Sequence, residues 1–338
     1  MHVILVSGPN RAHKLLVLLE GFDITHVQRL SDVRRLPVLA RRHSVVVVDS
    51  LGRIALLGFL ACLASWSPLV FRVRGPCFQE EREVFQAREG MSRWVRFLAN
   101  MGLAAFCLRV ARGILYNSGY TQALLAPHDR APRRAVVHNP YTPPAGRGEA
   151  DIDAPDTGLR VLTATNMNAK SKMDTLCDAI AEWIPPSFWA ESSTTWLICG
   201  GGLHEARLRE LVAGLGLEEH IQVLGQVDYL PALYDWCDVF VHLTYLDSFP
   251  NTVMEAMMCG KPVVTNERSC GTREQVVHNV TGLVVEEGPA VVDALRAYRA
   301  DPELGRRHGR AGRERVEKRF SVVVQAERLR DALDAMCA

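Results

Sequence analysis

The chain has 338 residues, of which 48% are hydrophobic and 23% charged, and its formal net charge is +1. That length exceeds one ordinary core and fits two domains, and the composition excludes a disordered or fibrous protein. The charge is unevenly divided: residues 1–150 hold 20 Lys and Arg against 10 Asp and Glu, and residues 151–338 hold 19 against 28. The basic half suits an anionic partner, such as a phosphorylated acceptor or an acidic membrane face, or it complements the acidic half.

The spacing of the cysteines and the N-terminal residues bear on the cellular compartment of the protein. The nine cysteines stand singly, without a C-x-x-C pair or metal-ligand spacing, which predicts reduced thiols, no metal site and a cytoplasmic protein. The first strand-like run lacks a charged leader, so we expect no signal peptide. Residues 54–71 carry no charge over a length that could span a membrane, but Trp66-Ser67-Pro68 interrupts them. We favour a buried helix that feeds a strand.

Short runs rich in β-branched residues alternate with longer helical patterns, which predicts parallel sheets in an α/β architecture. The expected strands are 2–7, 44–49, 69–73, 113–117, 135–139, 159–165, 195–200, 221–225, 239–244, 262–266 and 282–286. Proline and glycine crowd residues 140–158, which indicates a linker. We therefore predict two Rossmann-like doubly wound domains facing across a cleft, the usual place for a two-substrate site. Their ranges are 1–145 and 159–315, joined by a linker at 146–158 and followed by a C-terminal helix at 316–338 that could pack back on the first domain.

The most informative segment follows the strand that ends near Thr244. A helix is expected to begin at Asn251, with Asn251 as its N-cap, and to stop before Gly260 and Pro262. The backbone N–H groups of Asn251, Thr252 and Val253, with the helix dipole behind them, would suit a diphosphate. Glu255, one turn further on, could accept hydrogen bonds from ribose or hexose hydroxyls. The alternative is a capped helix in which Glu255 merely caps or pairs.

The run from Asp247 to Val264 resembles the signature of glycosyltransferase family 4, a group of retaining enzymes with the GT-B fold. That signature has two acidic residues separated by seven others, then an Ala-rich helix turn, Gly, a variable residue, Pro and a strand. The resemblance extends over about residues 113–290 and includes the loop Leu197–Gly202. It implies that Asp247, Phe249, Asn251 and Thr252 face sugar and phosphates and that Glu255 holds the ribose.

The resemblance also implies what the chain would bind. The donor substrate would be a nucleotide-diphosphate sugar of the UDP or GDP type, held without a cofactor or metal. The acceptor would be a small molecule or a lipid-linked glycan, and no nucleic acid is expected as a partner. The expected reaction is retaining transfer of a hexose or N-acetylhexosamine. The alternatives are a nucleotide-sugar epimerase, a phosphorylase-like enzyme and a non-catalytic transferase-like subunit.

Several positions depart from the family pattern. The first acid is usually Glu, so Asp247 is one methylene short, and Pro250 replaces a residue that is often Gly. Asn166 stands where Arg is common. Lys170 and Lys172 straddle the position of a lysine that would neutralise the leaving diphosphate, and we prefer Lys172.

Three features of the first half also bear on the site. Arg74 follows strand 69–73, where many members carry His, and would suit an acceptor's anionic group, the donor phosphates or an ordinary surface ion pair. Gly8 lies where the family has a glycine-rich loop near the phosphates. A helical region rich in aromatic residues carries Arg82, Arg88, Arg93, Arg96, Arg109 and Arg112. Family members with lipid-linked acceptors dock on the inner membrane face through such helices, whereas a solvated helix covering the sheet would need no membrane.

Overall fold

The computed structural model describes residues 1–7, 13–33, 44–49, 51, 54–86, 92–144, 146, 149, 152, 158–268 and 271–338. Its contacts divide the chain into two compact units. Unit 1 comprises Met1–Pro140 and Phe320–Ala338, and unit 2 comprises Tyr141–Arg319. The contact-based division thus lies at Pro140 and Arg319, while the domain boundaries at 145, 158 and 315 remain predictions.

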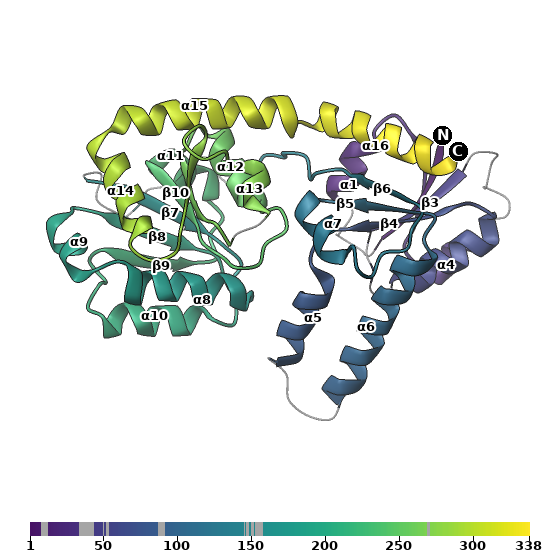
Figure 1. The fold of residues 1–338 in the computed structure, drawn as a ribbon, viewed down its shortest axis with the longest axis horizontal. Coiled ribbons are helices and arrows are strands. Elements are labelled where there is room, and N and C mark those ends of the chain that lie inside the picture. Colours follow the sequence, from purple (N-terminus) through teal and green to yellow (C-terminus); the bar gives the residue numbers. More distant parts are fainter. Residues whose placement is uncertain are drawn as a thin grey trace. The chain divides into compact units, whose positions relative to one another are not determined.

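Unit 1 is built on a parallel six-stranded sheet in the order β2-β1-β3-β4-β5-β6 (Figure 1). Its strands are β1 (His2–Val6), β2 (Asp23–Val27), β3 (Ser44–Val48), β4 (Leu69–Val73), β5 (Gly113–Tyr116) and β6 (Arg133–Val136). Its helices are α1 (His13–Leu18), α2 (Leu30–Val33), α4 (Ile54–Ser65), α5 (Cys77–Gln86), α6 (Ser92–Val110), α7 (Gly119–Leu125) and α16 (Val322–Cys337).

The central strands of unit 1 are buried on both faces, which explains their continuous apolar runs. On β1, Ile4 and Val6 belong to a cluster that includes residues of α4 and α6. The alternating Val3 and Leu5 belong to a second cluster that includes residues of α1 and α16. Because successive side chains of a strand point to opposite faces, helices cover both sides of the sheet.

Three expectations for unit 1 need correction. β2 was not anticipated, because this edge strand is only partly buried and has no apolar run. The strand expected at 135–139 is β6 at Arg133–Val136, shifted toward its two arginines. The helix expected to be buried, α4, leaves Leu56, Leu60 and Leu63 exposed to 57%, 43% and 72%. Among the described helices, none is long and apolar enough to cross a membrane.

Unit 2 has a second parallel six-stranded sheet, in the order β12-β11-β10-β7-β8-β9 (Figure 1). Its strands are β7 (Arg160–Ala164), β8 (Thr195–Cys199), β9 (Ile221–Gly225), β10 (Val239–His242), β11 (Val263–Asn266) and β12 (Gly282–Val285). Its helical elements are α8 (Lys170–Asp178), the π-helix η1 (Ala179–Trp183), α9 (Pro186–Glu191), α10 (Glu205–Gly214), α11 (Leu230–Trp236), α12 (Asn251–Met258), α13 (Thr272–Gln275), α14 (Ala290–Ala300) and α15 (Pro302–Arg319). The prediction of two α/β units with parallel, doubly wound sheets is confirmed.

The strand order of unit 2 reverses between β7 and β10, which pair directly through Val161 and Val239. In open α/β sheets, ligands bind in the crevice outside the carboxyl ends of the strands at such a switch point. The segments that follow β7 and β10 are those that carry the expected lysine and acidic residues. The topology therefore brings the two parts of the predicted site to one edge of the sheet.

A glycine-rich loop supports the segment after β7. The amide of Met167 donates to the carbonyl of Gly201 at 3.1 Å, and that of His204 donates to the carbonyl of Met167 at 3.1 Å. Gly200 has a φ of +124°, and a Cβ there would lie 1.8 Å from the carbonyl oxygen of Thr165. Only glycine fits this close approach, so the loop after β8 fixes the loop after β7.

Candidate functional site

The loop between β10 and α12 is held by hydrogen bonds from within unit 2. The amide of Thr244 donates to Asn266 Oδ1 at 3.0 Å, and the amide of Gly271 donates to the carbonyl of Asp247 at 3.1 Å. Gln275 Nε2 donates to the carbonyl of Pro250 at 2.8 Å. These bonds fix both Asp247 and the start of α12 from β11 and α13.

The N-cap of α12 lies one residue before the position that the sequence predicted. Pro250 is the N-cap, without a side-chain cap hydrogen bond, and Asn251 is the first helical residue. The Asn251 side chain therefore does not cap its own helix. The first-turn N–H groups of an α-helix have no carbonyl partner within it, so an acceptor from elsewhere suits this end of α12.

Asp247 lies at the centre of a small charged cluster. Its Oδ2 atom is 2.7 Å from Lys172 Nζ on α8 and 3.4 Å from His242 Nε2 at the end of β10. Only 19% of the Lys172 side chain, 11% of Asp247 and 2% of His242 are exposed. The structure thus brings a predicted lysine and the first acid of the signature together and adds a histidine that sequence reasoning missed.

Burial acts in opposite directions on the pKa values of Asp247 and His242. Desolvation alone would raise the pKa of Asp247, but Lys172 and His242 together hold that pKa well below its usual range. Burial lowers the pKa of His242, although Asp247 opposes the shift. These directions favour a carboxylate on Asp247 and a neutral imidazole on His242.

The buried neutral His242 predicts a pH dependence of stability. Below about pH 6.5 an unfolded chain binds a proton that the folded His242 resists, so the free energy of unfolding should fall as the pH is lowered from there. The measurement compares the melting temperature of the unchanged chain with that of His242→Gln between about pH 7.5 and 5.5. We expect the difference between the two to shrink on acidification. A constant difference would contradict a buried neutral imidazole.

Glu255 is positioned by a second residue that the sequence did not reveal. Tyr234 of α11 is fully buried, and its hydroxyl donates to Glu255 Oε2 at 3.0 Å and to the carbonyl of Thr252 at 3.3 Å. Burial, and then Glu255, raise the pKa of Tyr234 well above its ordinary value, so the phenol stays a donor. The bond orients one oxygen of Glu255 from α11.

The remaining donor-side candidates occupy different environments. Phe249 and Val253 are buried, whereas Asn251 and Thr252 are partly exposed on the first turn of α12. Asn166 Oδ1 accepts hydrogen bonds from the amide and side chain of Asn168, at 3.0 and 2.9 Å, and so shapes its own turn. A signal for Tyr234 or His242 could have come only from knowing which helices and strands are neighbours.

The two candidate lysines are clearly distinguished. Lys170 is half exposed and forms an i,i+4 ion pair with Asp174, which also binds Arg207 at 2.7 Å. Hydrogen bonding to Asp174 raises the pKa of Lys170. Lys172 instead reaches the Asp247 carboxylate. The geometry therefore places Lys172 in the candidate site and Lys170 in a surface ion-pair group.

In unit 1, the candidate Arg74 follows β4 and lies 3.6 Å from Asp49 Oδ1, with 37% of its side chain exposed. The buried Arg72 pairs with the same carboxylate at 3.2 Å and donates to Asn139 at 2.9 Å. Sequence reasoning missed this buried network, because Arg72 looked like the end of an apolar run. Gly8 and Arg88 lie outside the described residues.

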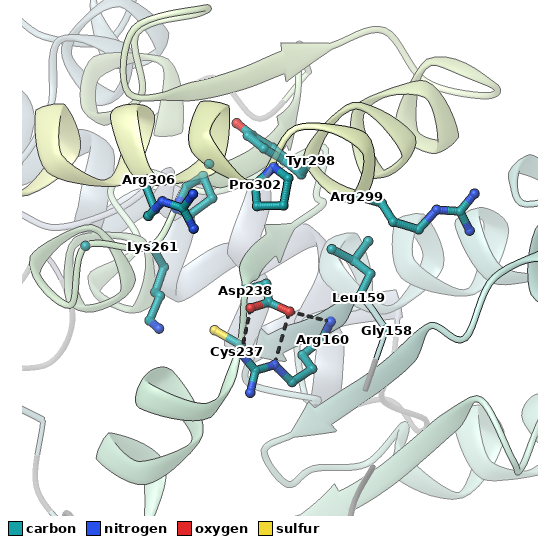
Figure 2. A pocket seen from close by; sticks show the side chains of 13 residues that line it. Gly158, Leu159, Arg160, Cys237, Asp238, Lys261, Tyr298, Arg299, Pro302 and Arg306 are labelled. Atoms are coloured by element: carbon teal, nitrogen blue, oxygen red, sulfur yellow. Dashed lines mark hydrogen bonds and ion pairs between the residues drawn. The ribbon is translucent and has the colours of Figure 1, made fainter. Parts of the chain in front are cut away.

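A concavity lies at the opposite, amino-terminal edge of the unit 2 sheet, with a cavity volume of about 330 Å³. Figure 2 shows Arg160 and Asp238 joined by a two-point contact, at 2.7 and 3.1 Å, while Lys261 and Arg299 extend in different directions. Its charged groups do not converge on one point, and Asp238 is already paired. The candidate site therefore stays at the carboxyl edge.

The family model described as "Glycosyl transferases group 1" matches residues 151–315, which include every candidate donor-side residue of unit 2. Unit 2 carries a glycosyl transferase group 1 domain. The resemblance seen in the signature at Asp247–Glu255 is thereby confirmed.

Curated relatives place this group 1 domain among several glycosyltransferases. D-inositol 3-phosphate glycosyltransferase of Salinispora tropica is 30% identical over 219 residues, covering 59% of this chain and 45% of the relative. A GDP-mannose-dependent phosphatidylinositol monomannoside mannosyltransferase of Mycobacterium tuberculosis is 32% identical over 148 residues, covering 40% and 38%. The matched segments thus span less than half of these relatives.

Solved structures extend the likeness to both units. Anabaena HepE in complex with UDP-glucose has a TM-score of 0.72 at 19% identity, with 99% of this chain and 100% of that chain covered. Sucrose-phosphate synthase of Thermosynechococcus elongatus has a TM-score of 0.71 at 17% identity, covering 99% of each chain. At these identities the likeness shows the fold alone, and the predicted GT-B fold is confirmed.

Proposed function

We propose that the chain is a retaining glycosyltransferase that takes a hexose or N-acetylhexosamine from a UDP- or GDP-sugar. The observation that carries the proposal is the Lys172–Asp247 contact of 2.7 Å at the β7/β10 switch point, beside the first turn of α12. It combines a cation for a diphosphate with a carboxylate for sugar hydroxyls. The mycobacterial relative is named for its dependence on GDP-mannose and the HepE structure holds UDP-glucose, and both support this donor class.

Each group has a role in the proposed reaction. Lys172 and the N–H groups at the start of α12 bind the diphosphate, and Glu255, oriented by Tyr234, accepts hydrogen bonds from the ribose. Asp247 and the first turn of α12, with Phe249 beneath, form the sugar side. Nothing in this arrangement needs a metal ion or cofactor, since protein groups supply the positive charge.

The proposed chemistry retains the configuration of the sugar. The bond between the anomeric carbon and the diphosphate oxygen breaks, and the acceptor oxygen bonds to the same face of that carbon. The acceptor's proton passes to an oxygen of the departing diphosphate, which Lys172 stabilises. Arg74 of unit 1, ion-paired with Asp49, is proposed to serve an anionic group of the acceptor.

An incubation with the donor alone separates the proposed function from its alternatives. A transferase releases nucleotide slowly without an acceptor and leaves the remaining donor sugar unchanged, whereas an epimerase converts the donor itself. Proton NMR of UDP-glucose and GDP-mannose incubated with the chain distinguishes the two. Conversion of the sugar within the intact donor would contradict the proposal, and so would the absence of binding to any nucleotide sugar.

Two helices of unit 1 support a peripheral membrane contact. Nine of the sixteen exposed large hydrophobic side chains of the described chain lie on α4, the residue Trp66 just after it, and α6. α4 and α6 meet through the rings of Phe59 and Phe106, whose centroids are 5.3 Å apart. Their 12 and 19 residues contain three arginines and no carboxylate. This combination suits an anionic bilayer surface, on which a lipid-linked acceptor would be presented.

Vesicle binding tests the membrane contact. The chain should co-sediment with phosphatidylglycerol vesicles and less with phosphatidylcholine vesicles. Leu63→Ser, at a side chain 72% exposed on α4, should weaken binding by about ten- to a hundredfold, because a buried leucine contributes about 1.5–3 kcal/mol. Leu203→Ser, at a side chain 79% exposed in unit 2, is the matched control. Equal binding by both variants would contradict this contact face.

A further inference from the structure

Two side chains approach the same oxygen of Asp247. Lys172 Nζ lies 2.7 Å from Oδ2, and His242 Nε2 lies 3.4 Å from it. Lys172 comes from α8 and is partly exposed, whereas His242 comes from the end of β10 and is almost completely buried. Asp247 therefore has one partner near solvent and one in the interior.

The inner contact is incomplete in this structure. His242 Nε2 is buried and forms no directed hydrogen bond with any group of the described chain, whereas Asp247 Oδ2 has Lys172 Nζ as its nearer partner at 2.7 Å. Buried polar atoms are almost always hydrogen-bonded, and those that are not call for an explanation. Here an imidazole nitrogen without a directed hydrogen bond lies 3.4 Å from a carboxylate oxygen that Lys172 pairs, so a small movement would join the two once Lys172 turns away.

A bound donor would change the ion pairing of the Asp247 carboxylate. A diphosphate draws the Lys172 ammonium toward its own negative charge, and this removes the cation from a largely buried carboxylate. A buried carboxylate left without a partner is costly. Among the described residues, His242 is the other side chain within 4 Å that can pair with Asp247.

We propose that His242 is a positioning residue that takes over the Asp247 carboxylate when Lys172 turns to the donor's diphosphate. The neutral imidazole donates its Nε2 hydrogen to Oδ2, which leaves Oδ1 to accept a hydroxyl of the sugar. No proton is transferred in this step. The inference rests on the proposed function, because it needs a diphosphate beside Lys172.

A double-mutant cycle on the full-length chain tests this coupling. His242→Met removes the donor at similar side-chain length, whereas His242→Gln keeps an N–H donor at about the same reach. His242→Met should weaken binding of UDP-glucose or GDP-mannose, whichever the unchanged chain binds, by about tenfold, and His242→Gln by less than about threefold. In an Asp247→Asn background, His242→Met should cost less than about twofold, since the charged acceptor is gone.

The outcomes separate the inference from the proposed function. An equal loss in both backgrounds, or no loss with His242→Met, would overturn the inference while donor binding by the unchanged chain still supported the function. No nucleotide-sugar binding by the unchanged chain would overturn both. Should His242→Met fail to fold, nitrogen NMR of the unchanged protein decides: the His242 Nε2 signal, assigned by its loss in His242→Gln, should shift when UDP is added. An unmoved signal would overturn the inference.

Discussion

Glu255→Gln should weaken UDP binding by about ten- to a hundredfold while leaving the melting temperature nearly unchanged, because hydrogen bonds to a charged group contribute about 1.5–3 kcal/mol. The amide oxygen of glutamine can still accept the hydrogen bond from Tyr234, which spans 3.0 Å in the unchanged chain. The loss would therefore fall on the ligand and not on the fold. Calorimetric titration with UDP and a thermal melt measure the two effects separately.

Glu255→Ala should behave differently. It removes the acceptor of a buried phenol as well as the ligand contact, so the free energy of unfolding should also fall by about 1–2 kcal/mol. Glu255→Ala combined with Tyr234→Phe should recover much of that stability without recovering UDP affinity. Glu218→Gln, at an exposed glutamate of the same unit, serves as the control. UDP affinity unaffected by Glu255→Gln would remove Glu255 from the ribose role.

Lys172→Met should lower the rate of nucleotide release from the donor by about a hundred- to a thousandfold, the scale seen when one group that stabilises a developing anion is removed. It should also destabilise the ligand-free chain, because Asp247 would lose the partner at 2.7 Å. Lys170→Met is the matched comparison, since Lys170 pairs with Asp174 on a half-exposed surface. Because Lys170 does not contact Asp247, its loss should leave the rate within about threefold, and the i,i+4 pair itself contributes only about 0.3–0.5 kcal/mol to stability.

The measurement is UDP or GDP release at saturating donor, with thermal melts of each variant alongside it. Similar rates for the two lysine variants would show that the Asp247 contact does not identify the lysine that serves the diphosphate. A larger effect at Lys170 would exchange their roles. A loss confined to Lys172→Met, and visible in variant chains that remain folded, is the expected outcome.

The sequence alone predicted the interior of both sheets well. Strands such as β1 and β3 are buried on both faces and therefore read as continuous apolar runs. The two edge strands of unit 1 lack that pattern, which is why β2 was not predicted and β6 was displaced. The exposed leucines of α4 were also misjudged, because an uncharged helix looks the same in sequence whether its outer face meets protein or solvent.

The site was predicted in part, for a similar reason. Asp247 and Glu255 lie on one continuous segment with a recognisable spacing, so pattern reasoning found them. The partners that orient them come from other elements: Lys172 from α8 and Tyr234 from α11. A tertiary pairing has no local spacing, so Lys172 could only be ranked beside Lys170, and Tyr234 and His242 gave no signal.

We expect unit 2 to bind a nucleotide sugar at the carboxyl edge of its sheet. Calorimetric titration of the full-length chain with a panel of UDP- and GDP-sugars tests it most directly. We predict saturable one-to-one binding of at least one donor with Kd between about 1 μM and 1 mM, the range common for enzyme substrates, and loss of that binding in Glu255→Gln. If no UDP- or GDP-sugar binds, or if Glu255→Gln binds the donor as tightly as the unchanged chain, the claim is wrong.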